Sequence, residues 1–100
     1  MNKLTLLLLI GILTGNNIIP LDKANAALKA GMYKEALEHL IIAEETIPQN
    51  CEVYRLKALL HEALDEQNKA LSSWKKCIQY TNDKNLIKEA NIHINSLLLE

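Results

Sequence analysis

The stretch Gly31–Pro48, GMYKEALEHLIIAEETIP, contains a turn glycine, one amphipathic helix and a proline stop, and the rest of the chain is organised around it. Similar residues recur 34 positions further along the chain. The shift places Ala36 on Ala70, Leu40 on Trp74, Ala43 on Cys77 and Ala24 on Ala58. Such a period indicates a helical repeat rather than an enzyme. It therefore predicts a protein that works by binding another protein.

The composition favours one small all-α domain. Of the 100 residues, 49% are hydrophobic but only 4% are aromatic and Phe is absent, so a core would consist of Leu, Ile and Ala, which suit helices. No stretch alternates with period two, so we expect no sheet. The formal net charge is −1 and there is no basic block, which argues against nucleic-acid binding.

Residues 1–16 have the composition of a signal peptide or a membrane anchor. A cationic start at Lys3 precedes the apolar run Leu4–Leu13, LTLLLLIGIL, which has the length of a signal-peptide core. A spanning helix needs roughly 20 apolar residues, and extending this run to Leu21 would include two asparagines and Pro20. We expect an exported or membrane-anchored protein rather than a cytoplasmic one. Contact with a membrane would involve only this segment.

Two cleavage sites are compatible with the pattern. Ala24-Asn25-Ala26 has small residues at the required places but lies far from the apolar run, and cutting there would remove most of the first helix. Leu13-Thr14-Gly15 lies at a suitable distance and would leave that helix whole, although Leu13 is large. The choice therefore decides whether the first helix is intact.

Residues 17–100 are expected to form five helices, at about 21–30, 33–46, 51–64, 69–81 and 86–99. Pro20 suits a first helical turn, Gly31 a helix end, and Asn50 a cap with Glu52 in the following turn. Each helix carries an apolar stripe at helical spacing. The expected inward-facing residues are Leu21, Ala24, Ala27 and Leu28; Tyr33, Ala36, Leu37, Leu40 and Ala43; Val53, Leu56, Leu59, Leu60, Ala63 and Leu64; Ala70, Leu71, Trp74, Cys77, Ile78 and Thr81; and Ile87, Ala90, Ile94, Leu97 and Leu98.

A helix pair that recurs after 34 residues, with small residues at fixed places, resembles the tetratricopeptide repeat (TPR) family. The resemblance covers two tandem copies, at about 17–50 and 51–84. The residues that carry it, and that we expect to pack the repeats, are Gly31, Tyr33, Ala36, Leu40, Ala43 and Pro48 in the first copy and Tyr54, Ala58, Ala70 and Trp74 in the second, together with Ala24 and Cys77. The resemblance implies a short right-handed solenoid of antiparallel helix pairs.

The second copy departs from the family pattern in its turn. Asp65 and Gln67 replace the glycine and the aromatic residue found at Gly31 and Tyr33, and Asn82 replaces the proline. Ile92 occupies the place aligned with Ala24 and Ala58, where a further helix would need a small side chain. We therefore interpret residues 86–99 as a capping helix. About three repeats are usually needed for stability, so two repeats and a cap imply a partner or self-association.

The two cysteines, Cys51 and Cys77, leave two alternatives open. Their spacing is not typical of a zinc site, and each lies where a helix stripe needs a small apolar residue, which favours two buried thiols. An antiparallel helix pair also brings the start of one helix to the end of the next, which would allow a disulfide in an oxidising compartment.

The sequence contains no convincing catalytic or metal-binding set. His61-Glu62 resembles the start of the zinc motif HExxH, but the second histidine is missing, and neither His39 nor His93 has the spacing of a ligand. Adjacent carboxylates such as Glu44-Glu45 and Asp65-Glu66 point apart on a helix. Trp74 is expected in the core. We therefore expect no enzyme activity, no metal and no cofactor.

The resemblance also implies where a partner would bind. In TPR proteins the first helix of each pair lines a concave groove, which here would carry Leu21, Asn25, Leu28 and Lys29 beside Glu52, Arg55, Leu59 and Glu62. Such a mixed groove suits an extended peptide or a helix. The lysine and asparagine set by which some TPR proteins hold a C-terminal carboxylate is not reproduced, because Leu21 occupies the lysine place.

These features together predict an exported or membrane-tethered adaptor, which binds a partner protein and assists the assembly or stabilisation of a complex. The alternative is a structural subunit that forms a homo-oligomer by closing its apolar groove on a second copy. The sequence does not identify the partner.

Overall fold

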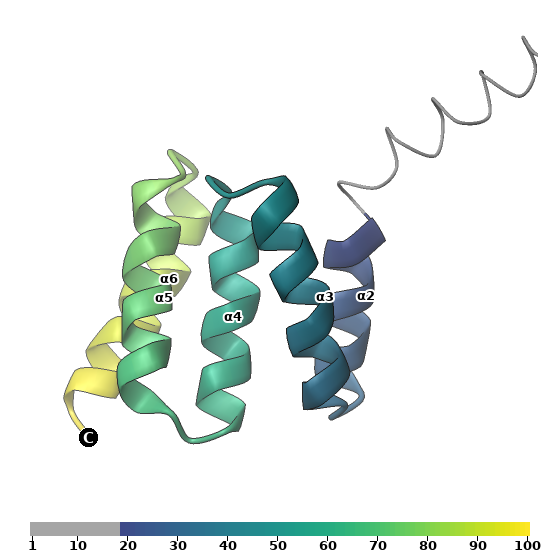
Figure 1. Cartoon of the computed structure of the whole chain (residues 1–100). Helices are drawn as coiled ribbons and strands as arrows, with labels where there is room; N and C mark the ends of the chain where they lie inside the picture. Colours follow the sequence, from purple (N-terminus) through teal and green to yellow (C-terminus); the bar gives the residue numbers. More distant parts are fainter. Residues whose placement is uncertain (1–18) are drawn as a thin grey trace, which may run out of the picture.

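A computed structural model describes residues 19–100 as five α-helices with no strand among them (Figure 1). They are α2 (Ile19–Lys29), α3 (Tyr33–Thr46), α4 (Cys51–Ala63), α5 (Gln67–Gln79) and α6 (Lys84–Leu98). The predicted all-α class is confirmed. The predicted signal peptide or anchor and the Gly15 cleavage site lie outside the described residues, whereas a cut after Ala26 would fall inside α2. None of the five helices combines the length and the apolar character that crossing a bilayer requires.

Helix α3 has the predicted bounds, and the other helices begin or end within about two residues of the prediction. The largest correction is at the end of α5, where Thr81 does not join the inward stripe. Its Oγ1 accepts a hydrogen bond from the backbone N–H of Asp83, 3.0 Å away, so Thr81 belongs to the turn. Asp83 then caps α6 by accepting from the backbone N–H groups of Asn85 and Leu86. Asn50 caps α4 in the same way, as predicted.

α4 lies in the middle of the fold, with α2 and α3 on one side of it and α5 and α6 on the other (Figure 1). α2 packs on α3, α4 on α5 and α5 on α6, and α4 also contacts both α3 and α2. The connections at residues 30–32 and 64–66 are short, so α2–α3 and α4–α5 form antiparallel hairpins. The two hairpins are joined through α4, which is the central helix of the fold.

The turns of the two hairpins have the same backbone structure. In the first, the N–H of Gly31 donates to Leu28 O and that of Met32 to Ala27 O; in the second, 34 residues on, Asp65 N–H donates to Glu62 O and Glu66 N–H to His61 O. This pair of bonds is the Schellman motif that ends many helices. Gly31 has φ 77° and Asp65 has φ 59°, so Asp65 adopts the left-handed conformation of the glycine that it replaces.

Burial repeats with the same offset. Ala24 and Ala58 are both 0% exposed, as are Ala36 and Ala70, and Ala43 and Cys77. Leu40 and Trp74, the large members of the pattern, are also fully buried. One core cluster lies among α2, α3 and α4 and a second among α4, α5 and α6. The alanines let the helices approach closely, while the leucine and the tryptophan supply most of the buried apolar area.

Four residues expected to face inward are exposed instead: Leu37, Ala63, Leu64 and Leu98. Leu37 lies at the edge of the α3 stripe, where α2 and α4 do not reach, and 40% of it is exposed. Ala63 and Leu64 lie where α4 turns into the loop. Leu98 is in the last turn of α6, with no described helix beyond it to cover it. These predictions were wrong because an apolar stripe shows which side of a helix faces the core, but not how many residues of that side the neighbouring helices cover.

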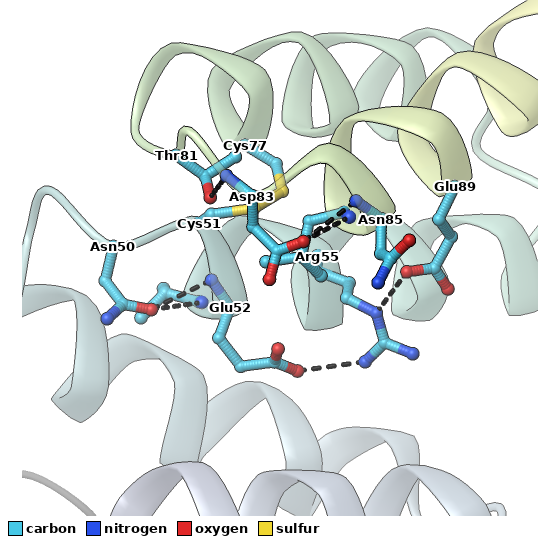
Figure 2. The surroundings of a disulfide bond; sticks show 11 residues. Asn50, Cys51, Glu52, Arg55, Cys77, Thr81, Asp83, Asn85 and Glu89 are labelled. Atoms are coloured by element: carbon cyan, nitrogen blue, oxygen red, sulfur yellow. Dashed lines mark hydrogen bonds and ion pairs between the residues drawn. A yellow bond between two sulfur atoms is a disulfide. The ribbon is translucent and has the colours of Figure 1, made fainter.

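A disulfide joins Cys51 at the start of α4 to Cys77 near the end of α5 (Figure 2). The favoured alternative of two separate thiols is therefore wrong, although both residues are buried as predicted. The bond lies at the end of the α4–α5 hairpin opposite its turn, beside Tyr54, Tyr80 and Leu86. The turn at residues 64–66 therefore closes one end of the α4–α5 hairpin, and the disulfide closes the other. By loop entropy alone, a bond across a separation of 26 residues stabilises a fold by about 3 kcal/mol.

The shared turn structure predicts opposite effects of substitution at its two left-handed positions. Gly31→Ala should lower the free energy of unfolding by about 1 kcal/mol. Outside Gly31 and its two chain neighbours, no atom lies within 4 Å of the added methyl group, so the cost would come from the backbone conformation. Asp65→Gly should raise the free energy of unfolding by a few tenths to about 1 kcal/mol, because it removes the same strain. Urea unfolding followed by circular dichroism measures both.

Ala30→Gly, at the residue before the left-handed Gly31, is the control for the conformational entropy that a glycine adds to the unfolded chain. If Gly31→Ala were neutral, or if Asp65→Gly destabilised as much as Ala30→Gly, the two turns would not share a strained position.

Candidate functional site

The eight residues that were predicted to bind a partner lie on α2 and α4, and we group them with the α6 residues that contact α4. α2 contacts α4, and ion pairs connect α4 to α6. We call this surface the α2–α4–α6 face; its members are Leu21, Asn25, Leu28 and Lys29 on α2, Glu52, Arg55, Leu59 and Glu62 on α4, and Glu89 and His93 on α6. The last two were not predicted.

The apolar residues of this face belong partly to the core. Leu21, Leu28 and Leu59 are half-buried and pack against the cluster that contains Ala24 and Leu60. Asn25 is also half-buried, whereas Lys29 is exposed. The α2 half of the face therefore offers a small apolar surface edged by one amide and one cation.

Arg55 connects α4 to α6 through two carboxylates. Its Nε donates to Glu89 Oε1 at 2.8 Å, and its terminal nitrogen donates to Glu52 Oε1 at 2.9 Å (Figure 2). Arg55 and Glu89 are 34 residues apart, so the contact joins positions of α4 and α6 that are separated by one period of the repeat. The hydrogen bond to Glu89 is the main reason why the pKa of Arg55 is raised above its ordinary value. One cation between two carboxylates leaves this part of the face negative.

Glu62 forms a second connection between α4, α5 and α6. Its Oε2 accepts the indole N–H of Trp74 at 2.6 Å and lies 2.8 Å from Nδ1 of His93. The His93 ring stacks on the indole of Trp74, with ring centroids 4.4 Å apart. Trp74 is in the core, as expected, but its one polar atom is satisfied from the α2–α4–α6 face. Glu62 is thus a positioning group for the indole and the imidazole.

The sequence contained a signal for this contact that the prediction did not use. The 34-residue offset that aligns Ala58 with Ile92 aligns His93 with Leu59, which lies about one helix turn before Glu62. The prediction compared the histidines only with one another, as possible metal ligands. The structure instead pairs one histidine with a carboxylate across two helices.

His61 lies apart from this face, near the second turn. Its Nδ1 is 2.9 Å from Glu66 Oε1, and Lys69 pairs with the same carboxylate from the other side. The hydrogen bond to His61 is the main cause that lowers the pKa of Glu66 below its ordinary value, followed by that to Lys69. Among residues 19–100, no three His, Cys, Asp or Glu side chains are placed to hold a metal ion.

The opposite side of α4 and α5 carries a hollow lined by Tyr54, Lys57, His61, Lys69 and Lys76, with Asn68, Ser72 and Ser73. Lys57 pairs with Glu44 at 2.7 Å, and Lys57 and Lys76 both lie over the Tyr54 ring. The Tyr54 hydroxyl donates to Pro48 O, and burial is the main cause that raises its pKa. Two of the three lysines are already paired with carboxylates, so the hollow is not strongly cationic.

No protein-family model, curated protein or solved structure matches the chain. The α2–α4–α6 face combines half-buried leucines with fixed charges.

The contacts of Glu62 predict that Glu62→Gln destabilises the fold and alters the environment of Trp74. The amide can still accept the indole N–H, but it loses the charge that pairs with His93, so the free energy of unfolding should fall by about 1–2 kcal/mol. Because Trp74 is the only tryptophan, the fluorescence of the folded protein reports on the contact directly.

Asp22→Asn, at an exposed position on α2 outside both the α2–α4–α6 face and α3, is the matched control. It should change the free energy of unfolding by less than about 0.5 kcal/mol and leave the fluorescence spectrum unchanged. Equal stability and identical spectra for the Glu62 and Asp22 variants would contradict the role assigned to Glu62.

Proposed function

We propose that the chain is a non-catalytic, TPR-like adaptor that binds a segment of a partner protein on its α2–α4–α6 face and so helps to assemble or stabilise a complex. The observation that supports it most is the 34-residue recurrence of the same turn hydrogen bonds, in a second hairpin whose sequence has lost the turn glycine. Repetition of one hairpin is what a helical solenoid requires. The capping role of α6 fits Ile92, which is exposed where Ala24 and Ala58 are buried.

The chemistry of the face limits the kind of segment that would bind. The α2 half presents parts of Leu21, Leu28 and Leu59, and the α4–α6 half presents Glu52, Glu62 and Glu89 around a single arginine. An amphipathic segment with apolar residues along one edge and basic residues along the other would match both halves. The charges also argue against the alternative in which an apolar groove closes on its own copy.

An exported or membrane-tethered location fits both the apolar N-terminal run and the disulfide between Cys51 and Cys77. Disulfides persist in oxidising compartments and are rare where thiols are kept reduced. We therefore place the adaptor outside the cytoplasm, and expect cleavage, if it occurs, after Gly15 rather than after Ala26. Only the former leaves α2 intact.

Affinity capture of the full chain from its native host tests this proposal. Asn25→Arg adds a long cationic side chain to the face and should reduce recovery of the bound partner by tenfold or more. Ala26→Arg, the next residue of α2 but exposed outside the predicted face, is the matched control and should leave recovery unchanged. Circular dichroism establishes that both variants remain folded.

Mass spectrometry of the captured chain reports its N-terminus and the state of its cysteines in the same experiment. Equal recovery with both variants, or an N-terminus at Ala27, would contradict the proposed binding face.

A further inference from the structure

The outer face of α3 carries the main exposed apolar surface of the described chain. Among residues 19–100, eight large hydrophobic residues are exposed, and four of them, Met32, Leu37, Ile41 and Ile42, belong to α3 or the residue before it. Ile41 and Ile42 are 51% and 50% exposed in the middle of the helix. The side of α3 that carries Ala36, Leu40 and Ala43 packs on α2 and α4, so the outer face has no partner among the described helices.

The charges on this face are arranged in a self-complementary order. Lys34, Glu38, Ile41 and Glu45 follow one another at the i, i+4, i+7, i+11 spacing of a single stripe, with Leu37 and Ile42 on either side. Lys34 and Glu45 stand at equal distances from the helix midpoint between His39 and Leu40, and so do Leu37 and Ile42. Lys34 and Glu45 form no ion pair within residues 19–100.

We propose that the outer face of α3 binds the same face of a second copy of the chain, as an antiparallel helix pair about a two-fold axis. In such a pair, residues of the central stripe at equal distances from the midpoint face each other, and each flank meets the same flank of the other copy. Lys34 of each copy meets Glu45 of the other, and Leu37 of each lies beside Ile41 of the other. The ion pair and the apolar contact are thus each made twice by one symmetric arrangement.

The flanks of the stripe suit this arrangement. A hollow lined by Ile41, Glu44, Glu45, Pro48 and Lys57 lies beside the C-terminal half of α3, which faces the N-terminal half of the other copy. The exposed Met32 lies at that N-terminal end. Glu38 faces Ile41 of the other copy and limits the apolar area, so we expect a weak dimer that forms reversibly with concentration.

This interface is separate from the proposed partner-binding face, because α3 contributes no residue to the α2–α4–α6 face. The dimer therefore does not rest on the proposed function. It would present two partner-binding faces in one assembly, and a bivalent adaptor can hold a repeated or dimeric partner more tightly than either face alone.

Charge reversal in the full chain tests the pairing, with sedimentation equilibrium as the measurement. Lys34→Glu alone puts Glu against Glu at both ends of the interface, and Glu45→Lys alone puts Lys against Lys. Each variant should dimerise about tenfold more weakly than the unchanged chain. An equimolar mixture of the two variants should regain the original affinity, because every facing pair is then Glu against Lys.

Ile41→Glu should abolish the dimer, whereas Ile92→Glu, the same change at an exposed position of α6, should leave it intact. Asn25→Arg should also leave it intact, which separates this test from that of the binding face. Residues 1–18 are the same in all variants, so association through them would be common to all. The proposal would be overturned if the mixture dimerised no more tightly than either charge variant alone, or if Ile41→Glu and Ile92→Glu weakened the dimer equally. The α3 face would then belong to another occupant.

Discussion

The fold depends on close approach between helices at four fully buried alanines, Ala24, Ala36, Ala58 and Ala70. A methyl group lets two helix backbones pack near one another, and interiors packed at crystal-like density have no room to absorb a larger side chain. Alanine itself buries little apolar area, so the stability must come from elsewhere. Leu40, Leu56, Leu60 and Trp74 supply it, and the disulfide and the helix caps add to it.

The second hairpin compensates for what its sequence lacks. It has Asp65 in place of a glycine and Cys77 in place of an alanine, yet its turn has the hydrogen bonds of the first hairpin. The disulfide fixes its open end, and Trp74 fills the core while its indole N–H is held by Glu62. A domain of this size has a total stability of only about 5–15 kcal/mol, so each of these contacts is a large part of it.

The sequence was sufficient to predict the all-α class and the positions of the five described helices, because the signals for helices are local. The bounds of α3, the cap at Asn50 and the burial of the alanines all follow from spacing within about one turn of helix. The contact between Glu62 and His93 and the choice between thiols and a disulfide depend on how three helices meet, which no local pattern contains. The exposure of Leu37 was missed for the same reason. Leu37 belongs to the exposed outer face of α3, a surface that the sequence analysis did not predict.

Unfolding measurements on alanine variants test the central claim, that one hairpin structure occurs twice and packs through small residues. Ala36→Leu and Ala70→Leu occupy equivalent places and should each lower the free energy of unfolding, by a similar amount of about 1–3 kcal/mol. Ala30→Leu, at an exposed position, should change it by less than about 0.5 kcal/mol. If either buried variant proved as stable as the unchanged chain, or if only one of the two were destabilised, the account of a repeated hairpin would be contradicted.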